Sequence, residues 1–237
     1  MKQLIKNLIK RIPISFTLNQ KYDIQTKKII QRVCKTNSNC IDVGCHKGEV
    51  LDIILKQSPR GRHFAFEPIP AMYENLKKKY LNCHVYQIAL SDKEGETSFN
   101  YVVSNPAYSG LIKRKYDREN EVDQLITVKT GKLDSIIPPE VNIDFIKIDV
   151  EGGELLVLKG AAQTITRCKP FIIFEHGMGA SDYYGSTPSQ VFDLLSGCGL
   201  HISTMENWLK GKSEMTAEEF KYQFENKINY YFIAYPK

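Results

Sequence analysis

Three carboxylates follow an apolar segment in the sequence FIKIDVEGGELLVLKG, residues 145–160. The apolar run predicts a buried strand over 143–150, with Asp149, Glu151 and Glu154 around its end. Because a charge is costly to remove from water, carboxylates at the mouth of a buried strand indicate a site that binds a cation, a proton or a polar ligand.

We assign these side chains different roles. Asp149 is expected to face a cofactor or a metal, and Glu151 to act near a substrate as a base or a ligand. Glu154 falls in the first turn of the next predicted helix, where the helix dipole alone favours an acid, so we interpret it as structural. Lys147 is interpreted as a counter-charge inside the sheet, too far from the strand tip to be the base.

A second polar pair closes the next apolar segment, PFIIFEHG, at Glu175 and His176. Neighbouring parallel strands end at one edge of a sheet, so Asp149, Glu175 and His176 are expected to converge there. Two carboxylates and an imidazole predict an octahedral Mg²⁺ or Mn²⁺ site. The alternatives are metal-free catalysis, with Glu175 or His176 as general base, and a purely structural role.

A glycine turn follows the first predicted strand in IDVGCHKG, with Asp42 near the strand end, Gly44 in the turn and Gly48 at the start of a helix. Glycines at these positions allow a tight turn and the close approach of a ligand to helix N–H groups. The G-x-x-x-G spacing differs from the G-x-G-x-x-G of dinucleotide-binding proteins.

The next two strands also end in polar residues. HFAFE ends at Glu67, 25 residues after Asp42, where a carboxylate can accept two hydrogen bonds from a ribose diol. In ALSD, Ala89 and Leu90 are expected to wall a flat ring, and Ser91 to bind its edge.

Strand and helix signals alternate along most of the chain, which predicts an α/β fold with a parallel sheet covered by helices on both faces. We expect strands within 40–43, 62–67, 83–92, 143–150, 170–177, 200–207 and 229–237. The last strand follows no predicted helix and is expected to run antiparallel. Between 96 and 136 the alternation is interrupted by two strand signals, which predict a small β insertion after the third strand.

Several segments together resemble the FkbM family of S-adenosylmethionine-dependent methyltransferases. The resemblance covers roughly residues 38–180 and rests on IDVGCHKG, FEPIPAMYENLKK, ALSDKEG, KLDSI, DFIKIDVEGGELLVLKGA and KPFIIFEHG, in that order. It implies a class I methyltransferase fold (Rossmann-like), with a seven-stranded sheet whose last strand is antiparallel. It also implies O-methylation of a hydroxyl on a sugar, a glycan or another secondary metabolite.

The strand ends that match the family are the expected cofactor-binding positions. Family sequences usually carry Ala-Asn after the first glycine, where this chain has Cys45 and His46, so the resemblance is weaker for the fine contacts of that turn. The expected S-adenosylmethionine site comprises Asp42, Gly44, Cys45, His46, Gly48, Glu67, Pro68, Ala89, Leu90, Ser91 and Asp149.

Composition sets the broad class of protein. The chain has 237 residues, of which 42% are hydrophobic and 11% aromatic, enough for a sizeable core. The net charge of +5 is concentrated in MKQLIKNLIKRIP and LIKRKY; a nucleic-acid binder would spread it more widely, so we expect no nucleic-acid partner. Six cysteines without a C-x-x-C pair indicate free thiols and a cytoplasmic protein.

The N-terminus predicts a short basic amphipathic helix, in which Leu4, Ile5, Leu8, Ile9 and Ile12 share one face. We expect this face to pack on the protein itself, with peripheral membrane contact as the alternative. The predicted organisation is a helical extension at 1–36 and a single methyltransferase domain at 37–237. The sequence leaves the oligomeric state open.

Two polar loops are expected to line the acceptor side. SNPAYSG contributes Tyr108 and Ser109; it lacks the second proline of the N-P-P-Y motif found in nucleic-acid enzymes that methylate amino groups. HGMGASDYYGS offers Tyr183 and Tyr184 for stacking on a sugar.

Two other function classes are weighed against O-methyl transfer. One is an NAD-dependent oxidoreductase or epimerase, which lacks its glycine motif here, and the other is a non-catalytic module that docks on membranes.

Overall fold

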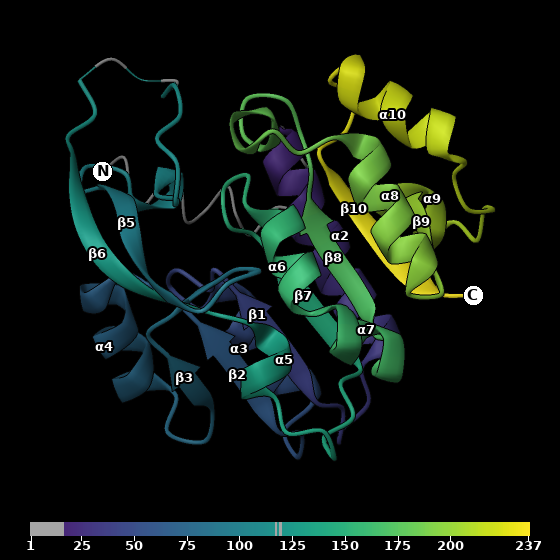
Figure 1. Cartoon of the computed structure of the whole chain (residues 1–237). Coiled ribbons are helices and arrows are strands. Elements are labelled where there is room, and N and C mark those ends of the chain that lie inside the picture. Colours follow the sequence, from purple (N-terminus) through teal and green to yellow (C-terminus); the bar gives the residue numbers. More distant parts are fainter. Residues whose placement is uncertain (1–16, 117, 119) are drawn as a thin grey trace.

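The computed structural model describes residues 17–116, 118 and 120–237. Its main feature is a seven-stranded sheet of order β3-β2-β1-β7-β8-β10-β9 (Figure 1). The strands are β1 (Cys40–Val43), β2 (His63–Phe66), β3 (His84–Tyr86), β7 (Phe145–Ile148), β8 (Phe171–Glu175), β9 (Leu200–Thr204) and β10 (Tyr231–Pro236).

Only β10 runs against the others in this sheet. It pairs antiparallel with both β8 and β9, whereas the remaining pairs are parallel. The predicted fold, a seven-stranded class I methyltransferase sheet with its last strand antiparallel, is therefore confirmed.

Helices cover both faces of the sheet (Figure 1). The larger core packs Ile146, Ile148 and Phe174 against helices on one face. Those helices are α5 (Leu133–Ile136), α6 (Glu154–Gly160), α7 (Ala162–Cys168), α8 (Pro188–Gly197) and α10 (Ala217–Glu225). The other face packs on α2 (Leu18–Val33), α3 (Glu49–Gln57), α4 (Pro70–Lys79) and α9 (Met205–Leu209).

Successive side chains of a strand point to opposite faces, and this alternation decides which polar groups meet. In β7, Ile146 and Ile148 belong to the larger core, whereas Phe145 belongs to the smaller core beside α2 and α3. Lys147 has the parity of Phe145 and therefore points to the α2 face. In β8, Ile173 lies in the same smaller core, and Glu175 follows it on that face.

The predicted β insertion is present as a second sheet of order β4-β6-β5. Its strands are β4 (Ala89–Leu90), β5 (Gly95–Val102) and β6 (Asp123–Gly131), and η1 (Pro106–Tyr108) lies in the connection between β5 and β6. The single strand expected within 83–92 is in fact two strands in different sheets, because β4 leaves the main sheet to pair with the end of β6.

Two other expectations were wrong in detail. The predicted helix with Glu154 in its first turn is in fact two helices, α6 and α7, that meet at Ala161. The strand expected at 200–207 ends at Thr204, whose hydroxyl caps α9, and α10 then precedes β10. The capping box of α10, Thr216 with Glu219, is a signal in the sequence that predicts this helix.

Helix α2, part of the predicted extension at 1–36, packs directly on the sheet. Its Tyr22, Ile29 and Ile30 are buried in the core cluster that contains Ile173 and Ile233. The helix expected at 1–12 lies outside the described residues, and the boundary at residue 36 stays a prediction. Among the described helices, none has the length and apolar character of a membrane span.

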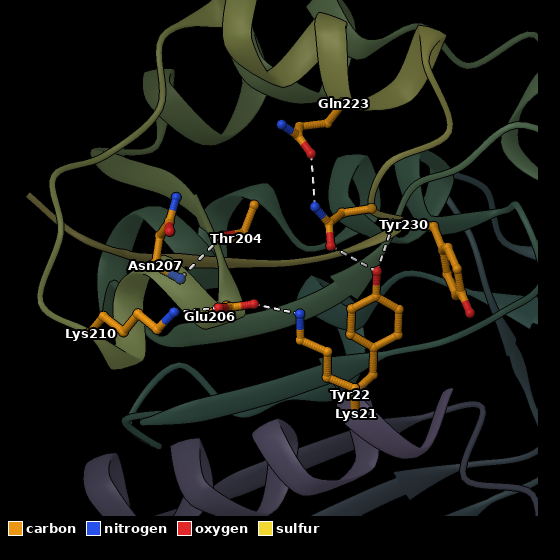
Figure 2. A network of polar contacts seen from close by, with 9 residues as sticks. Lys21, Tyr22, Thr204, Glu206, Asn207, Lys210, Gln223 and Tyr230 are labelled. Carbon is orange, nitrogen blue, oxygen red and sulfur yellow. Dashed lines mark hydrogen bonds and ion pairs between the residues drawn. The ribbon is translucent and has the colours of Figure 1, made fainter. Parts of the chain in front are cut away.

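Polar contacts join α2 to the C-terminal part of the chain (Figure 2). Glu206 of α9 accepts from Lys21 and Lys210. The Tyr22 hydroxyl donates to Asn229 Oδ1 at 3.0 Å, and Asn229 Nδ2 donates to Gln223 of α10 at 2.8 Å. Helices from both ends of the chain are thereby tied to the segment that leads into β10.

Candidate active site

A cleft of about 1380 Å³ opens at the carboxyl ends of the parallel strands. Its walls come from the turns after β1 and β2, from β4, from the ends of β7 and β8, and from α2. Of the residues that sequence reasoning placed at a site, those lining it are Asp42, Gly44, Cys45, His46, Glu67, Pro68, Ala89, Leu90, Tyr108, Ser109, Asp149, Glu151, Glu175 and Tyr183.

The turn after β1 depends on Gly44. Its φ is +74°, and a Cβ atom there would lie 1.8 Å from the Asp149 carbonyl oxygen. The Gly44 and Cys45 N–H groups donate to the Phe66 carbonyl at 3.0 and 3.2 Å. Gly44 therefore lets β1, β2 and β7 end close together. Gly48 has a φ of +77° and faces Tyr80 instead of the cleft.

Glu67 is a buried carboxylate at the tip of β2. Its Oε2 accepts from the His46 N–H at 2.9 Å and its Oε1 from the Ile69 N–H at 3.0 Å. Burial raises its pKa to about 7 despite these two bonds. Each oxygen has a second lone pair, so Glu67 can still accept hydrogen bonds from a diol in the cleft.

Asp42 is also buried at the cleft, 2% exposed, and its Oδ2 has no hydrogen-bond partner within the described ranges. Burial raises its pKa to about 7, and the charge of Lys147 opposes that rise. An unsatisfied buried oxygen of a residue that lines a cleft indicates a ligand contact.

Ser91, which was expected to bind the edge of the cofactor ring, is buried outside the cleft. Its hydroxyl donates to Asp92 at 3.3 Å.

Three carboxylates converge at the ends of β7 and β8. One ligand oxygen from each of Asp149, Glu151 and Glu175 lies within 4.8 Å of the others. We call these three residues the acidic cluster. Burial raises the pKa of Glu175 well above its usual range, and the neighbouring Asp149 and Glu151 charges add to the effect. The surroundings of Glu175 therefore favour its neutral, protonated form.

Two side chains hold Asp149. Lys147 Nζ lies 2.9 Å and the Tyr231 hydroxyl 2.5 Å from Asp149 Oδ2. Burial alone would raise the pKa of Asp149, but the Lys147 charge and these hydrogen bonds outweigh it, so the pKa is lowered. This lowered pKa favours the ionised form of Asp149.

Glu151 also lines the cleft and has a left-handed backbone conformation with a φ of +59°. Arg114, from the connection between β5 and β6, forms an ion pair with it. Burial and the Asp149 charge raise the pKa of Glu151 to about 8, against the opposing charge of Arg114. This side chain can exchange a proton near neutral pH.

Comparison with known proteins identifies the family to which the chain belongs. The model of the methyltransferase FkbM domain matches residues 42–202, which hold the glycine turn, Glu67 and the acidic cluster. This chain belongs to the FkbM methyltransferase family. Membership makes S-adenosylmethionine-dependent methyl transfer its activity class.

Individual relatives are distant. The 2-O-methyltransferase NoeI of Sinorhizobium fredii is 26% identical over 185 residues, which cover 71% of this chain and 75% of NoeI. The AMB antimetabolite synthetase AmbE of Pseudomonas aeruginosa is 24% identical over 207 residues, covering 71% of this chain and 10% of AmbE.

A solved structure supports the fold. The methyltransferase FkbM from Methylobacillus flagellatus KT superimposes with a TM-score of 0.51 and 15% identity, over 85% of this chain. The match covers 44% of that protein, so this chain spans less than half its length. At this identity the likeness concerns the fold alone.

His176 does not join the site in this FkbM family member. Its ring is fully buried on the other face of the sheet, stacked on Phe220 and Phe224 of α10 with centroids 5.6 and 4.8 Å away. The expectation that His176 acts as a catalytic residue or a metal ligand fails because it follows Glu175 by one residue and therefore points to the opposite face.

Glu154 is structural, as expected. Its Oε1 accepts from the Val150 and Gly152 N–H groups at 3.0 and 3.1 Å, which closes the turn that carries Glu151. The side chain is buried and lies outside the cleft lining.

The segment that follows SNPAYSG contacts the loop after β8. The Tyr184 and Tyr183 hydroxyls accept from the Ile112 and Lys115 N–H groups at 3.1 and 3.3 Å. Tyr183 lines the cleft, whereas Tyr184 packs beneath the loops against Gly152 and Gly153.

Sequence reasoning missed several residues of the cleft. Lys147 is not one of them: it was expected as a counter-charge, and it lines the cleft and pairs with Asp149 as that interpretation requires. No sequence signal points to the missed residues, because their place depends on how distant segments pack. They include Arg114, Tyr116, Tyr230, Tyr231 and the α2 residues Asn19, Asp23 and Lys27.

Proposed function

We propose that this protein is an O-methyltransferase that transfers the methyl group of S-adenosylmethionine to a hydroxyl of a sugar, a glycan or another secondary metabolite. The observation that carries the proposal is that one cleft is lined both by Asp42 and Glu67 and by the acidic cluster. The name of NoeI, a 2-O-methyltransferase, supports a hydroxyl acceptor.

The cofactor is proposed to lie along the tips of β1, β2 and β4. Glu67 would accept the ribose hydroxyls, Ala89 and Leu90 would wall the adenine, and the Gly44 turn would approach the methionine part. Asp42, whose Oδ2 lacks a partner among the described residues, would meet a cationic or hydrogen-donating group of the cofactor.

Methyl transfer is a displacement in which the acceptor oxygen attacks the methyl carbon. The new O–C bond forms as the C–S bond breaks, and the electron pair of that bond stays on sulfur. The acceptor proton must leave to a base. Asp149 is already held by two donors, whereas Glu151 lines the same cleft and has a pKa of about 8, so it gains and loses a proton near neutral pH. We therefore propose the ionised form of Glu151 as the proton acceptor.

The acidic cluster fits a resident Mg²⁺ or Mn²⁺ poorly, although carboxylates are the ligands that these ions prefer. Asp149 is already paired with Lys147, and Glu151 with Arg114. His176, the expected third ligand beside Asp149 and Glu175, lies on the other face. The proposed reaction therefore includes no metal-dependent step.

The cellular setting is proposed from the sequence alone. We propose that the protein works in the cytoplasm, in glycan or secondary-metabolite biosynthesis, with peripheral membrane contact of its N-terminal segment as a secondary hypothesis. Membership of the FkbM family removes the NAD-dependent alternative.

Calorimetric titration with S-adenosylhomocysteine and with NAD tests the cofactor assignment. We expect the first to bind and the second not to bind. Incubation with methyl-labelled S-adenosylmethionine and extracts of the host then identifies the acceptor by the label it gains. Labelling of a nitrogen or carbon centre would contradict O-methylation, and failure to bind S-adenosylhomocysteine would favour a non-catalytic module.

Paired variants test these two parts of the cleft lining. Glu67→Ala is expected to abolish S-adenosylhomocysteine binding, because it removes the proposed ribose acceptor. Glu175→Ala is expected to retain binding and to lose turnover. Equal loss of cofactor binding in both variants would show that the end of β8 belongs to the cofactor pocket instead.

A further inference from the structure

Lys147 is a buried cation at the centre of the proposed active site. Its side chain is 5% exposed and lines the cleft. Nζ lies 2.9 Å from Asp149 Oδ2 and 4.8 Å from the centroid of the Tyr231 ring. An ammonium held between a carboxylate and an aromatic face is fixed in position, in contrast to the usual mobile surface lysine.

The sheet surrounds this ammonium with acidic groups. Asp42 is the residue paired with Lys147 on β1. On the other side, Ile173 of β8 pairs with Lys147, and Glu175 is the next residue of β8 on the same face. Tyr231 pairs with Glu175. Three neighbouring strands, β1, β8 and β10, therefore direct polar side chains towards Lys147.

A divalent cation would need that same place. The oxygens of the acidic cluster lie within 4.8 Å of one another, and Lys147 already donates to one of them. A second cation beside the ammonium would be repelled in a buried environment, where charges interact strongly. The positive charge that a metal would bring is thus already supplied by the chain.

We propose that the Lys147 ammonium is the active-site cation, taking the part that a divalent metal would play towards the acceptor hydroxyl. This inference rests on the proposed O-methyl transfer. The ammonium has three protons, one of which is directed to Asp149. Another donates to the acceptor oxygen, which orients its lone pair towards the methyl group and makes the hydroxyl more acidic.

The step balances with Lys147 unchanged. The hydroxyl proton passes to the Glu151 carboxylate, the oxygen forms its bond to the methyl carbon, and the sulfonium becomes a neutral thioether. Lys147 remains an ammonium throughout, so it is a donor and an electrostatic catalyst, and the base is another residue.

The test of the metal-free part needs no acceptor. Mn²⁺ is titrated into the wild-type protein and followed by electron paramagnetic resonance, first alone and then with S-adenosylhomocysteine. We expect no binding of Mn²⁺ at the acidic cluster. Binding of Mn²⁺ to the wild-type protein that is lost in Glu175→Gln would overturn the proposal, whatever reaction the protein catalyses.

The catalytic part is tested with Lys147→Met, Lys147→Arg and the exposed control Lys159→Met. We expect Lys147→Met to lower kcat about 10²- to 10³-fold, the usual effect of removing one preorganised donor. The dissociation constant of S-adenosylhomocysteine should stay within about twofold, which shows that the variant is folded. Lys147→Arg should recover at least about tenfold in kcat because it restores the charge.

The outcomes separate this inference from the proposed function. Absence of methyl transfer by the wild-type protein would remove the proposed function, whereas wild-type turnover that EDTA abolishes would remove only the role of Lys147. An unchanged kcat in Lys147→Met, or equal losses in the Met and Arg variants, would also overturn it. If Lys147→Met does not fold, the Mn²⁺ titration and the kcat of Lys147→Arg still test the proposal.

Discussion

At the scale of single residues, burial turns His176 into an aromatic core residue. Neither ring nitrogen has a hydrogen-bond partner in the described part of the chain, and the ring stacks on two phenylalanines of α10. Burial lowers its pKa to about 4, so the folded protein holds the neutral form. Such a residue contributes to core packing, and it lowers the stability of the folded protein at acidic pH.

Replacing His176 with Phe should therefore be tolerated and should change the response to pH. Below a pH of about 6.5 the unfolded chain protonates His176, whereas the folded chain does not do so until about pH 4. Stability is then lost as pH falls, by up to about 3 kcal/mol at pH 4. Urea unfolding at pH 7.5 and 5.0 should show a smaller acid loss in His176→Phe than in the wild type.

The control measurement for this variant is turnover at neutral pH. His176→Phe should keep wild-type kcat because the ring lies on the face of the sheet away from the cleft. A folded His176→Phe variant without activity would instead restore the catalytic role that the sequence suggested.

The Tyr231 hydroxyl makes a separate prediction, since it donates to Asp149 at 2.5 Å while its ring lies beside Lys147. Tyr231→Phe keeps the ring and removes one hydrogen bond to a charged group, a bond worth about 1.5–3 kcal/mol. We expect kcat to fall roughly tenfold if the bond matters mainly in the transition state. The dissociation constant of S-adenosylhomocysteine should not change.

Tyr235→Phe is the matched control for that measurement. Tyr235 lies on the same strand, next to His201 and Trp208 and outside the cleft lining. Similar losses of kcat in both variants would indicate a general effect on β10 and contradict a specific role for the Tyr231 hydroxyl.

At the scale of secondary-structure elements, the order of strands and helices follows from the sequence because apolar runs and helical periodicity alternate clearly. The carboxyl-end positions of Asp42, Glu67 and Asp149 follow as well, since each ends a recognisable strand. The two-residue period of a strand also led to Lys147 as a counter-charge beside Asp149, and the ion pair between them confirms this interpretation. The same period was not applied to the next strand, where it separates Glu175 from His176.

Other features depend on packing that local sequence does not determine. The strand expected within 83–92 divides between two sheets because β4 finds its partner some 40 residues later, in β6. Arg114 reaches Glu151 only because the insertion folds back over the strand ends. Helix α10 is different, because its capping box, Thr216 with Glu219, is a local sequence signal that was not used.

The contact between the turn after β1 and the end of β7 yields a prediction about Gly44. A Cβ at this position would meet the Asp149 carbonyl oxygen at 1.8 Å, in addition to the left-handed φ of +74°. We expect Gly44→Ala to lose at least about 3 kcal/mol of unfolding free energy, since the backbone itself must move apart. S-adenosylhomocysteine binding should be lost with it.

Gly211→Ala measures the cost of the left-handed backbone conformation without the steric clash that a Cβ atom meets at Gly44. Gly211 also has a left-handed φ, +68°, but a Cβ there would have no neighbour within 4 Å among the atoms of the described residues. Its alanine variant should lose only about 1–2 kcal/mol, the cost of the conformation itself. Equal destabilisation of the two variants in urea unfolding would show that the approach of Gly44 to Asp149 is unimportant.

At the scale of the whole molecule, the cleft is assembled from segments that span nearly all of the described sequence. Helix α2 supplies one wall, the connection between β5 and β6 another, and β10 brings Tyr230 and Tyr231. The two ends of this series, α2 and β10, lie beside each other in the structure (Figure 1). The position of Tyr231 against the acidic cluster therefore depends on how α2 docks.

Tyr22 is the residue through which this docking can be tested. Its hydroxyl donates to Asn229 Oδ1 at 3.0 Å and accepts from the Tyr230 N–H at 3.3 Å (Figure 2). Its ring packs on the rings of Tyr230 and Tyr231. Tyr22→Phe keeps the ring contacts and leaves the two polar groups without this partner. The expected loss of unfolding free energy is about 1 kcal/mol.

The effect on function should exceed what that loss of stability suggests, because the loosened segment carries Tyr231. We expect faster amide hydrogen exchange at residues 229–231 and a kcat reduced in the same direction as in Tyr231→Phe, with unchanged S-adenosylhomocysteine binding. Tyr222→Phe, at a side chain that is 57% exposed on α10, should change none of these. If Tyr22→Phe loses stability while exchange at 229–231 and kcat stay at wild-type values, α2 supports the fold without positioning the site.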